Sequence, residues 1–189
     1  KVLPVPACEL TLRLAMDEVE ALRRLNDWGG QPLPLSASCW HDGTLWLRLS
    51  GAAPAVRSAA ARIGGETTSE PQAVEHWRAL REQTHAFFAG AAPLWRLSLP
   101  TIAPPLDLDA APLMEWGGGL RWLRSALPLS QIRARAAALG GNATLFRGGD
   151  RSQGVFAPLM PALLVIHRRL RDAFDPHGVF DGGRLYAGL

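Results

Sequence analysis

An internal repeat constrains the fold of this chain more than any other feature of its sequence. The matching positions, which a shift of 76 residues superimposes without a gap, are Gly43 with Gly119, Trp46-Leu47-Arg48 with Trp122-Leu123-Arg124, Arg57 with Arg133, Gly64-Gly65 with Gly140-Gly141, and Thr68 with Thr144. Tryptophan is rare enough that its recurrence argues against a chance match. The chain therefore contains two copies of one structural unit.

The first copy has the pattern strand, helix, strand, strand, helix, strand. Polar and apolar residues alternate over 9–14, which is typical of a half-buried strand. Asp17 and Glu20 form a capping box that begins a helix, and Asp42-Gly43 is a strong signal for a hairpin between two strands. Helical spacing over 56–63 ends at a glycine pair. This βαββαβ order is that of the ferredoxin-like unit.

The second copy is abbreviated, because prolines interrupt the stretch where its first helix would lie. These prolines are Pro100, Pro104, Pro105 and Pro112. Since proline disrupts a helix interior, we expect a loop there. The predicted fold class is α+β: duplicated ferredoxin-like βαββαβ units form one large antiparallel sheet, with helices on one face and the other face available for a partner.

Further segments link and extend the two units. The units span about residues 9–69 and 93–147 within a domain over 9–157, and a helix over 70–89 joins them. A last helix ends near Phe174, within a closing segment over 158–189. The first eight residues contain two prolines and read as an extended linker, so we expect another segment before them. The seven tryptophans follow strand and helix stripes and are interpreted mostly as core.

The composition fits one or two small domains with a hydrophobic core. Of the 189 residues, 48% are hydrophobic and 20% are charged, and the net charge is +3. No apolar run is long enough to cross a bilayer, and no signal peptide opens the sequence. Two cysteines, Cys8 and Cys39, are too few for a disulfide scaffold, which favours an intracellular location.

The carboxy-terminal run provides the most specific motif. It reads Phe174-Asp175-Pro176-His177-Gly178-Val179-Phe180-Asp181-Gly182-Gly183-Arg184-Leu185-Tyr186. This run resembles the tail of FAD-linked oxidases of the vanillyl-alcohol oxidase type, F-D-P-x-G-[IV]-[FL]-N-P-G-R-[LM], which returns the chain to the flavin-binding domain. Two positions differ from that pattern, Asp181 in place of Asn and Gly182 in place of Pro.

The whole chain looks like the cap domain of that flavoprotein family. The segments 34–43 and 47–51, with the closing residues 184–189, are most similar to the E subunits of bacterial glycolate oxidases. The resemblance implies a missing amino-terminal FAD-binding domain, to which residues 1–8 are the linker and toward which residues 158–189 return. It also implies oxidation of a small 2-hydroxy acid, glycolate to glyoxylate, with hydride passing to the flavin.

The resemblance further implies partners and a location. They are a D-type flavoprotein subunit and an F-type iron–sulfur subunit, with neither nucleic acid nor a membrane-spanning segment. We expect a cytoplasmic protein that reaches the inner membrane only through these partners. The cap fragment alone is expected to be catalytically inactive.

Candidate site residues follow from the motif and from the sheet pattern. Matched to the tail motif, Asp181 and Arg184 are candidate flavin contacts. Trp40 and His41, at a strand end, and Arg147, in a glycine-rich loop, are candidate substrate contacts. No catalytic residue is assigned. The histidines are too scattered along the sequence to predict a metal site: His41, His76, His85, His167 and His177.

Two other classes of function remain open at this point. An interaction scaffold would use the uncovered sheet face as a subunit interface within the same complex. An RNA-binding module would share the βαββαβ order, but it needs stacked aromatic and basic residues on its central strands, and 43–49 offers one Trp and one Arg. The RNA-binding alternative is therefore remote.

Overall fold

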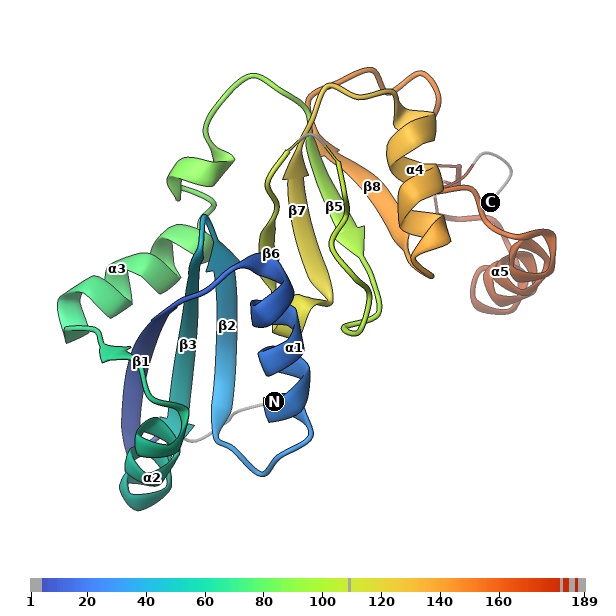
Figure 1. Ribbon diagram of the computed structural model, residues 1–189. Coiled ribbons are helices and arrows are strands. Elements are labelled where there is room, and N and C mark those ends of the chain that lie inside the picture. Colours follow the sequence, from blue (N-terminus) through green and yellow to red (C-terminus); the bar gives the residue numbers. More distant parts are fainter. Residues whose placement is uncertain (1–4, 109, 181, 184–185, 187–189) are drawn as a thin grey trace.

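The computed structural model describes residues 5–108, 110–180, 182–183 and 186. At its centre is an eight-stranded antiparallel sheet with the order β4-β1-β3-β2-β6-β7-β5-β8 (Figure 1). The strands are β1 (Cys8–Ala15), β2 (Leu35–His41), β3 (Thr44–Gly51), β4 (Glu66–Thr67), β5 (Leu94–Ser98), β6 (Leu113–Glu115), β7 (Leu120–Arg124) and β8 (Asn142–Arg147). The helices are α1 (Glu18–Gly29), α2 (Ala53–Ile63), α3 (Glu70–Arg81), α4 (Leu129–Ala138) and α5 (Pro161–Phe174), with short 3-10 turns η1 (Ala86–Phe88) and η2 (Trp116–Gly118).

The sheet consists of two units with the same topology, as the repeat predicted. In the first unit the four strands lie in the order β4-β1-β3-β2, and in the second the equivalent strands lie in the order β8-β5-β7-β6. The helices α2 and α4 begin 76 residues apart, at Ala53 and Leu129. The predicted fold class, with duplicated ferredoxin-like units in one antiparallel sheet, is therefore confirmed.

The units join through equivalent edge strands, β2 and β6. These strands pair antiparallel, with Cys39 opposite Glu115 and Trp40 opposite Met114. Because both units contribute the same edge in opposite directions, the sheet has an approximate internal two-fold symmetry at this seam. The two edges cover each other, which removes two unpaired strand edges from the surface.

Three helices cover one face of the sheet. Alternate residues of the strands point to this face and form two adjoining cores, one under α1 and α2 and the other under α4. In the first unit Leu12, Leu47 and Val56 are almost fully buried, and in the second Leu97, Leu123 and Ile132 are. This is the face that the sequence predicted to carry the helices.

The opposite face is only partly free, because α3 and η1 lie against it. Leu80 of α3 and Phe88 of η1 are buried in a third core cluster together with Leu113 and Trp122. The helix predicted over 70–89 is shorter in the structure and ends at Arg81. The chain cannot continue as a helix there because Gln83 has a left-handed backbone conformation, with φ 56°.

A loop replaces the first helix of the second unit, as its prolines predicted. The buried guanidinium of Arg121 lies where this helix would be, and it donates hydrogen bonds to the carbonyls of Ala103, Pro104 (2.6 Å) and Gly118 (3.1 Å). Arg121 occupies the repeat position of Leu45, which is buried under α1. A charged donor therefore satisfies loop carbonyls at a site where the first unit has only apolar packing.

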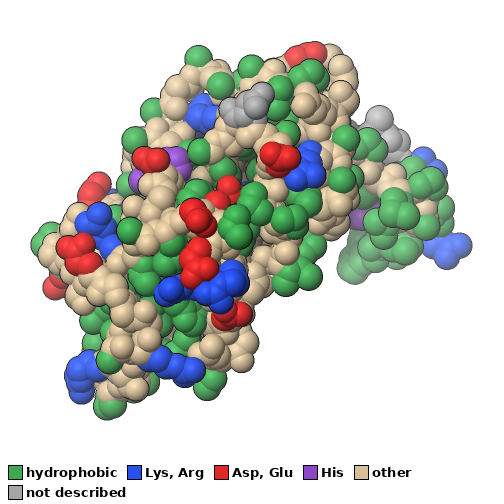
Figure 2. All heavy atoms as spheres, viewed as in Figure 1, with side chains coloured by type: hydrophobic (Ala, Val, Ile, Leu, Met, Phe, Trp, Pro, Cys, Tyr) green, Lys and Arg blue, Asp and Glu red, His purple; other side chains and the backbone are tan. Residues whose placement is uncertain are grey.

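The last helix, α5, lies apart from the sheet beside α4 (Figure 1). Its predicted end at Phe174 is confirmed, and none of its side chains is buried. Figure 2 shows hydrophobic side chains gathered on this helix. They include Leu163, Ile166 and Leu170, which are each about half exposed. The helix thus presents an apolar stripe that no described residue of the chain covers.

Candidate functional site

The sheet face turned away from α1, α2 and α4, here called the open face, is closed over the first unit by α3. The ring of His76 stacks on Trp46 of β3, with centroids 3.8 Å apart and planes within 11°. The indole of Trp77 donates a hydrogen bond to the Thr11 hydroxyl of β1, at 3.0 Å. These contacts leave the first unit little free surface on this side.

Over the second unit the open face carries a cluster of aromatic and charged side chains beside η1, whose Phe88 ring packs edge to face on Trp122 at 5.5 Å. We call it the aromatic–arginine patch, and it consists of Arg96 (β5), Glu115 (β6), Trp116 (η2), Trp122 (β7) and Phe146 (β8). The rings of Trp122 and Phe146 meet edge to face at 5.0 Å. Trp116 and Phe146 are exposed by 67% and 43%, whereas Trp122 is only 6% exposed. Exposed aromatic rings that converge on one sheet face are typical of a recognition surface.

Trp116 has an unusual backbone at the edge of this patch. Its φ is 53°, in the left-handed region that bulky residues rarely adopt. The neighbouring Gly117 N–H donates to the hydroxyl of Ser38, at 2.9 Å, which ties this turn to the first unit. The Trp116 ring lies against the Arg96 guanidinium, 5.5 Å from the ring centroid. A strained residue that places an exposed ring beside a cation is a candidate for function.

Glu115 sits beneath these groups. The Trp122 indole N–H donates to one of its carboxylate oxygens, at 2.8 Å. Burial raises the pKa of the Glu115 carboxyl above its usual value, while this hydrogen bond and the charge of Arg96 partly oppose the rise. The patch thus combines a cation, a carboxyl of elevated pKa and three aromatic rings, a set that can bind a small polar molecule.

Three histidines far apart in sequence meet beside α3. The ring of His85 lies 5.9 Å from that of His41 and 5.8 Å from that of His76. Burial lowers the pKa of His76 to about 4, and the positive charges of His85 and Arg13 act in the same direction. Across the described residues, no three His, Cys, Asp or Glu side chains are grouped so that they could hold a metal ion. Burial also lowers the pKa of His85, so both His76 and His85 are harder to protonate than a free imidazole.

We expect His76 to make the protein less stable in mild acid. The unfolded chain binds a proton at His76 near pH 6.5, whereas the folded chain binds it only near pH 4, so stability present above pH 6.5 is lost as the pH falls toward 4. In His76→Phe the ring still stacks on Trp46 but does not titrate. Between pH 7.5 and 5, wild type should lose about 1 to 2 kcal/mol more than this variant, as measured by urea unfolding. Equal losses in both proteins would exclude His76 as the cause.

The structure separates two of the predicted substrate contacts. Trp40 is 6% exposed, lies on the helix-covered face and donates its indole N–H to the Met16 carbonyl, at 2.9 Å. His41 lies on the opposite face, against the ring of Phe87 at 5.1 Å. Adjacent residues of a strand point to opposite faces, so these two do not share one site.

The other predicted site residues lie elsewhere. Arg147 is exposed at the end of β8, where it donates to the Gln83 side chain and lies near the ring of Phe146. It is therefore next to the aromatic–arginine patch, and its substrate role stays a prediction. Asp181 and Arg184, the expected flavin contacts, lie outside the described residues.

Sequence reasoning missed Arg96, Glu115 and Trp116. A signal was present, because Leu-Trp-Arg-Leu-Ser over 94–98 alternates and places Arg96 on the face opposite Trp95 and Leu97. What the sequence does not show is that α3 and η1 pack on the open face in a way that leaves Trp116 exposed.

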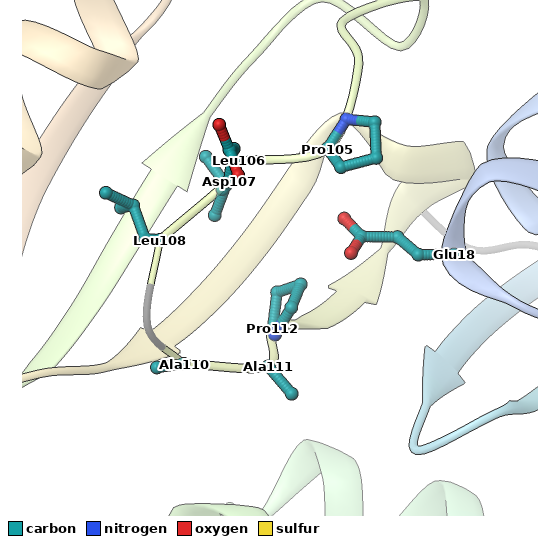
Figure 3. A pocket seen from close by; sticks show the side chains of 8 residues that line it. All are labelled: Glu18, Pro105, Leu106, Asp107, Leu108, Ala110, Ala111 and Pro112. Carbon is teal, nitrogen blue, oxygen red and sulfur yellow. The ribbon is translucent and has the colours of Figure 1, made fainter.

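A cavity of about 400 Å³ lies on the helix side of the sheet, beside the loop that replaces the missing helix. Figure 3 shows the Glu18 carboxylate directed from α1 toward this loop, between Pro105 and Pro112. Burial raises the pKa of Glu18, and the nearby Arg121 opposes the rise. Loop residues form most of the walls, so we regard the cavity as a consequence of the shortened second unit.

Several arginines of the second unit have structural partners. Arg124 donates to the carbonyls of residues 87, 88, 90 and 92, Arg133 to those of 154 and 156, and Arg135 to those of 105 and 106. Together with Arg121, they fasten loops to the sheet and α4. Four of the 20 Lys and Arg side chains of the chain are thus bonded to backbone carbonyls of the fold.

The fold and the patch define an α+β domain of two units with one part of its sheet open to a ligand or partner. None of the helices in the described part of the chain is both long and apolar enough to span a bilayer. No family model matches the chain. Over its whole length, it is 44% identical to glycolate oxidase subunit GlcE of Escherichia coli (strain K12). The chain spans about half, 52%, of the length of that curated relative.

Proposed function

We propose that the chain is the cap portion of an FAD-dependent oxidoreductase that converts glycolate, or a closely related 2-hydroxy acid, to the corresponding 2-oxo acid. The observation that carries this proposal is the 44% identity to a glycolate oxidase subunit over every residue of the chain. The flavin would accept a hydride from the substrate and pass electrons onward, as flavins do. The residues of this chain would bind and orient the substrate beside it.

The proposal assigns the flavin chiefly to the half of the protein that this chain does not span. Two surfaces of the chain fit such a neighbour. The apolar stripe of α5 is exposed, and so are Val179 and Phe180 after it, by 77% and 74%. The Asp175 carboxylate accepts the N–H groups of both, at 2.7 and 2.9 Å, which fixes the turn that presents them. We propose that α5 and this turn dock onto the flavin-binding half, where Asp181 and Arg184 would approach the cofactor.

Within the cap, we propose that the aromatic–arginine patch is the surface that faces the flavin. Its rings would exclude water from the reacting atoms, and Glu115 and Arg96 supply polar groups in a half-buried setting. The helix face of the sheet offers no comparable set among the described residues, because its apolar side chains are buried in the cores and its Arg121 guanidinium is bonded to backbone carbonyls.

We expect the longer protein, including the half before this chain, to purify with bound flavin and to reduce an artificial electron acceptor with glycolate. The 189-residue chain alone should be colourless and inactive. Flavin absorbance and acceptor bleaching measure both properties. A longer protein that carries no flavin after reconstitution with FAD would contradict the proposal.

A second function, a non-catalytic scaffold in the same complex, is favoured by the exposed stripe of α5. In this alternative the protein would assemble with a D-type flavoprotein and an F-type iron–sulfur subunit without turning over substrate. Co-purification with such partners, together with no glycolate oxidation by the flavin-loaded protein alone, would favour it.

A further inference from the structure

Arg96 differs from the arginines that fasten the loops of the second unit. Arg121, Arg124, Arg133 and Arg135 each donate to backbone carbonyls. Within the described part of the chain, the Arg96 guanidinium has no carboxylate at ion-pair distance and donates no hydrogen bond; its contact is the ring of Trp116. Its five N–H donors are therefore free for a ligand.

The surroundings of Arg96 limit the position of its guanidinium. The Trp116 ring lies 5.5 Å away, on a turn that the hydrogen bond from the Gly117 N–H to Ser38 ties to the first unit. A planar guanidinium beside a ring presents a fork of N–H groups that matches the two oxygens of a carboxylate. The positive charge of Arg96 acts to lower the pKa of the Glu115 carboxyl, against the effect of burial. One Glu115 oxygen already accepts a hydrogen bond from the Trp122 indole N–H. The other oxygen lies free of protein donors in the described structure.

We infer that Arg96, positioned by Trp116, binds the carboxylate of a small 2-hydroxy acid, and that the free oxygen of Glu115 accepts a hydrogen bond from the hydroxyl group of the same acid. The inference rests on the proposed function for the identity of the acid. The two polar groups have one aromatic neighbour each, the Trp116 ring beside Arg96 and the Trp122 indole bonded to Glu115, which suits a small acid. Trp116 acts through Arg96 and is a positioning residue.

The first test is ligand binding by the 189-residue chain, followed by NMR. Glycolate is the probe, and the signals are the Arg96 side-chain N–H and the Trp116 indole N–H. We expect saturable shifts at both signals with glycolate, smaller shifts with acetate, and none with the neutral analogue glycolamide. In Arg96→Met the shift of the Trp116 signal should disappear, and in the matched control Arg57→Met, an exposed position on α2, it should persist. Equal shifts with glycolamide, or an unchanged response in Arg96→Met, would overturn the inference.

The second test uses the longer protein loaded with flavin. Arg96→Met should raise the KM for glycolate on the order of 50-fold, since hydrogen bonds to a charged group are lost, while kcat changes little. Arg96→Lys should recover part of this loss, because it keeps the charge but not the fork. Trp116→Ala should raise KM less than Arg96→Met does, with flavin content unchanged in every variant.

The outcomes separate this inference from the proposed function. A flavin-loaded wild type that oxidises glycolate, with an unchanged KM in Arg96→Met, would overturn the role of Arg96 and leave the function intact. A longer protein without flavin would overturn the function, and the NMR titration would then decide on its own whether Arg96 binds the acid.

Discussion

Replacing Arg121 by methionine should lower the free energy of unfolding by about 3 to 5 kcal/mol. Arg121 is fully buried and donates to three backbone carbonyls, those of Ala103 and Pro104 in the loop that replaces the missing helix and that of Gly118 in η2. Methionine fills a similar volume but has no donor. The carbonyls of Ala103 and Gly118 would then remain buried without a partner, that of Pro104 would lose its donor, and the loop over β7 would lose its attachment.

The equivalent position in the first unit of the repeat shows where the expected loss of stability comes from. Leu45 occupies the same position in the first unit, so an apolar side chain is compatible with the strand itself. The expected loss of unfolding free energy in Arg121→Met therefore arises from the carbonyls that lose their donor. As a control, Arg57→Met removes an exposed arginine of α2 and should change stability by no more than about 0.5 kcal/mol. The midpoint of urea unfolding measures both variants; similar midpoints would show that the loop does not depend on Arg121.

The second large effect is expected at the glycine pairs that end α2 and α4. The second glycine of each pair, Gly65 or Gly141, lies against the backbone of the neighbouring strand. A Cβ at Gly141 would come within 2.1 Å of the Ser98 carbonyl oxygen, and one at Gly65 within 2.7 Å of the Arg13 carbonyl oxygen. Each alanine variant should therefore lose about 3 kcal/mol or more, because backbone must move.

Alanine variants of two other glycines distinguish the effect of this steric clash from the effect of backbone strain. Gly64 has φ 76° and ψ −163°, a backbone region essentially restricted to glycine, but open space around it, so Gly64→Ala should cost about 1 to 3 kcal/mol from strain alone. Gly29, in the last turn of α1, has neither restriction, and Gly29→Ala should be neutral or slightly stabilising. Urea unfolding of the four variants should give this order. If Gly141→Ala unfolds at the same midpoint as Gly29→Ala, the close approach of strand and turn is not as described.

The sequence predicts the architecture well because the architecture depends on local patterns. Repeated tryptophans and glycine pairs reveal the duplication, and the prolines after β5 remove one helix. The Asp42-Gly43 hairpin pairs Trp40 with Leu45. Both side chains therefore lie on the helix face, although Trp40 was predicted as a substrate contact from its place at a strand end.

The candidate site was less predictable, since it depends on which helix covers which part of the sheet. The helix α3 follows the first unit and returns over its open face, whereas α5 follows the second unit and lies apart from the sheet. The hydrophobic periodicity of these two helices in the sequence does not show which of them packs on the sheet. For this reason Trp116, interpreted from its pattern as core, is 67% exposed beside Arg96.

The central claim is that the open face of the second unit and α5 cover a flavin-binding half of the same protein. Hydrogen–deuterium exchange, compared between the 189-residue chain and the flavin-loaded longer protein, tests it most directly. The amides of α5 and of the turn around Trp116 should exchange much more slowly in the longer protein, and those of α2 should exchange at the same rate in both. Unchanged exchange at α5 and at this turn would contradict the account.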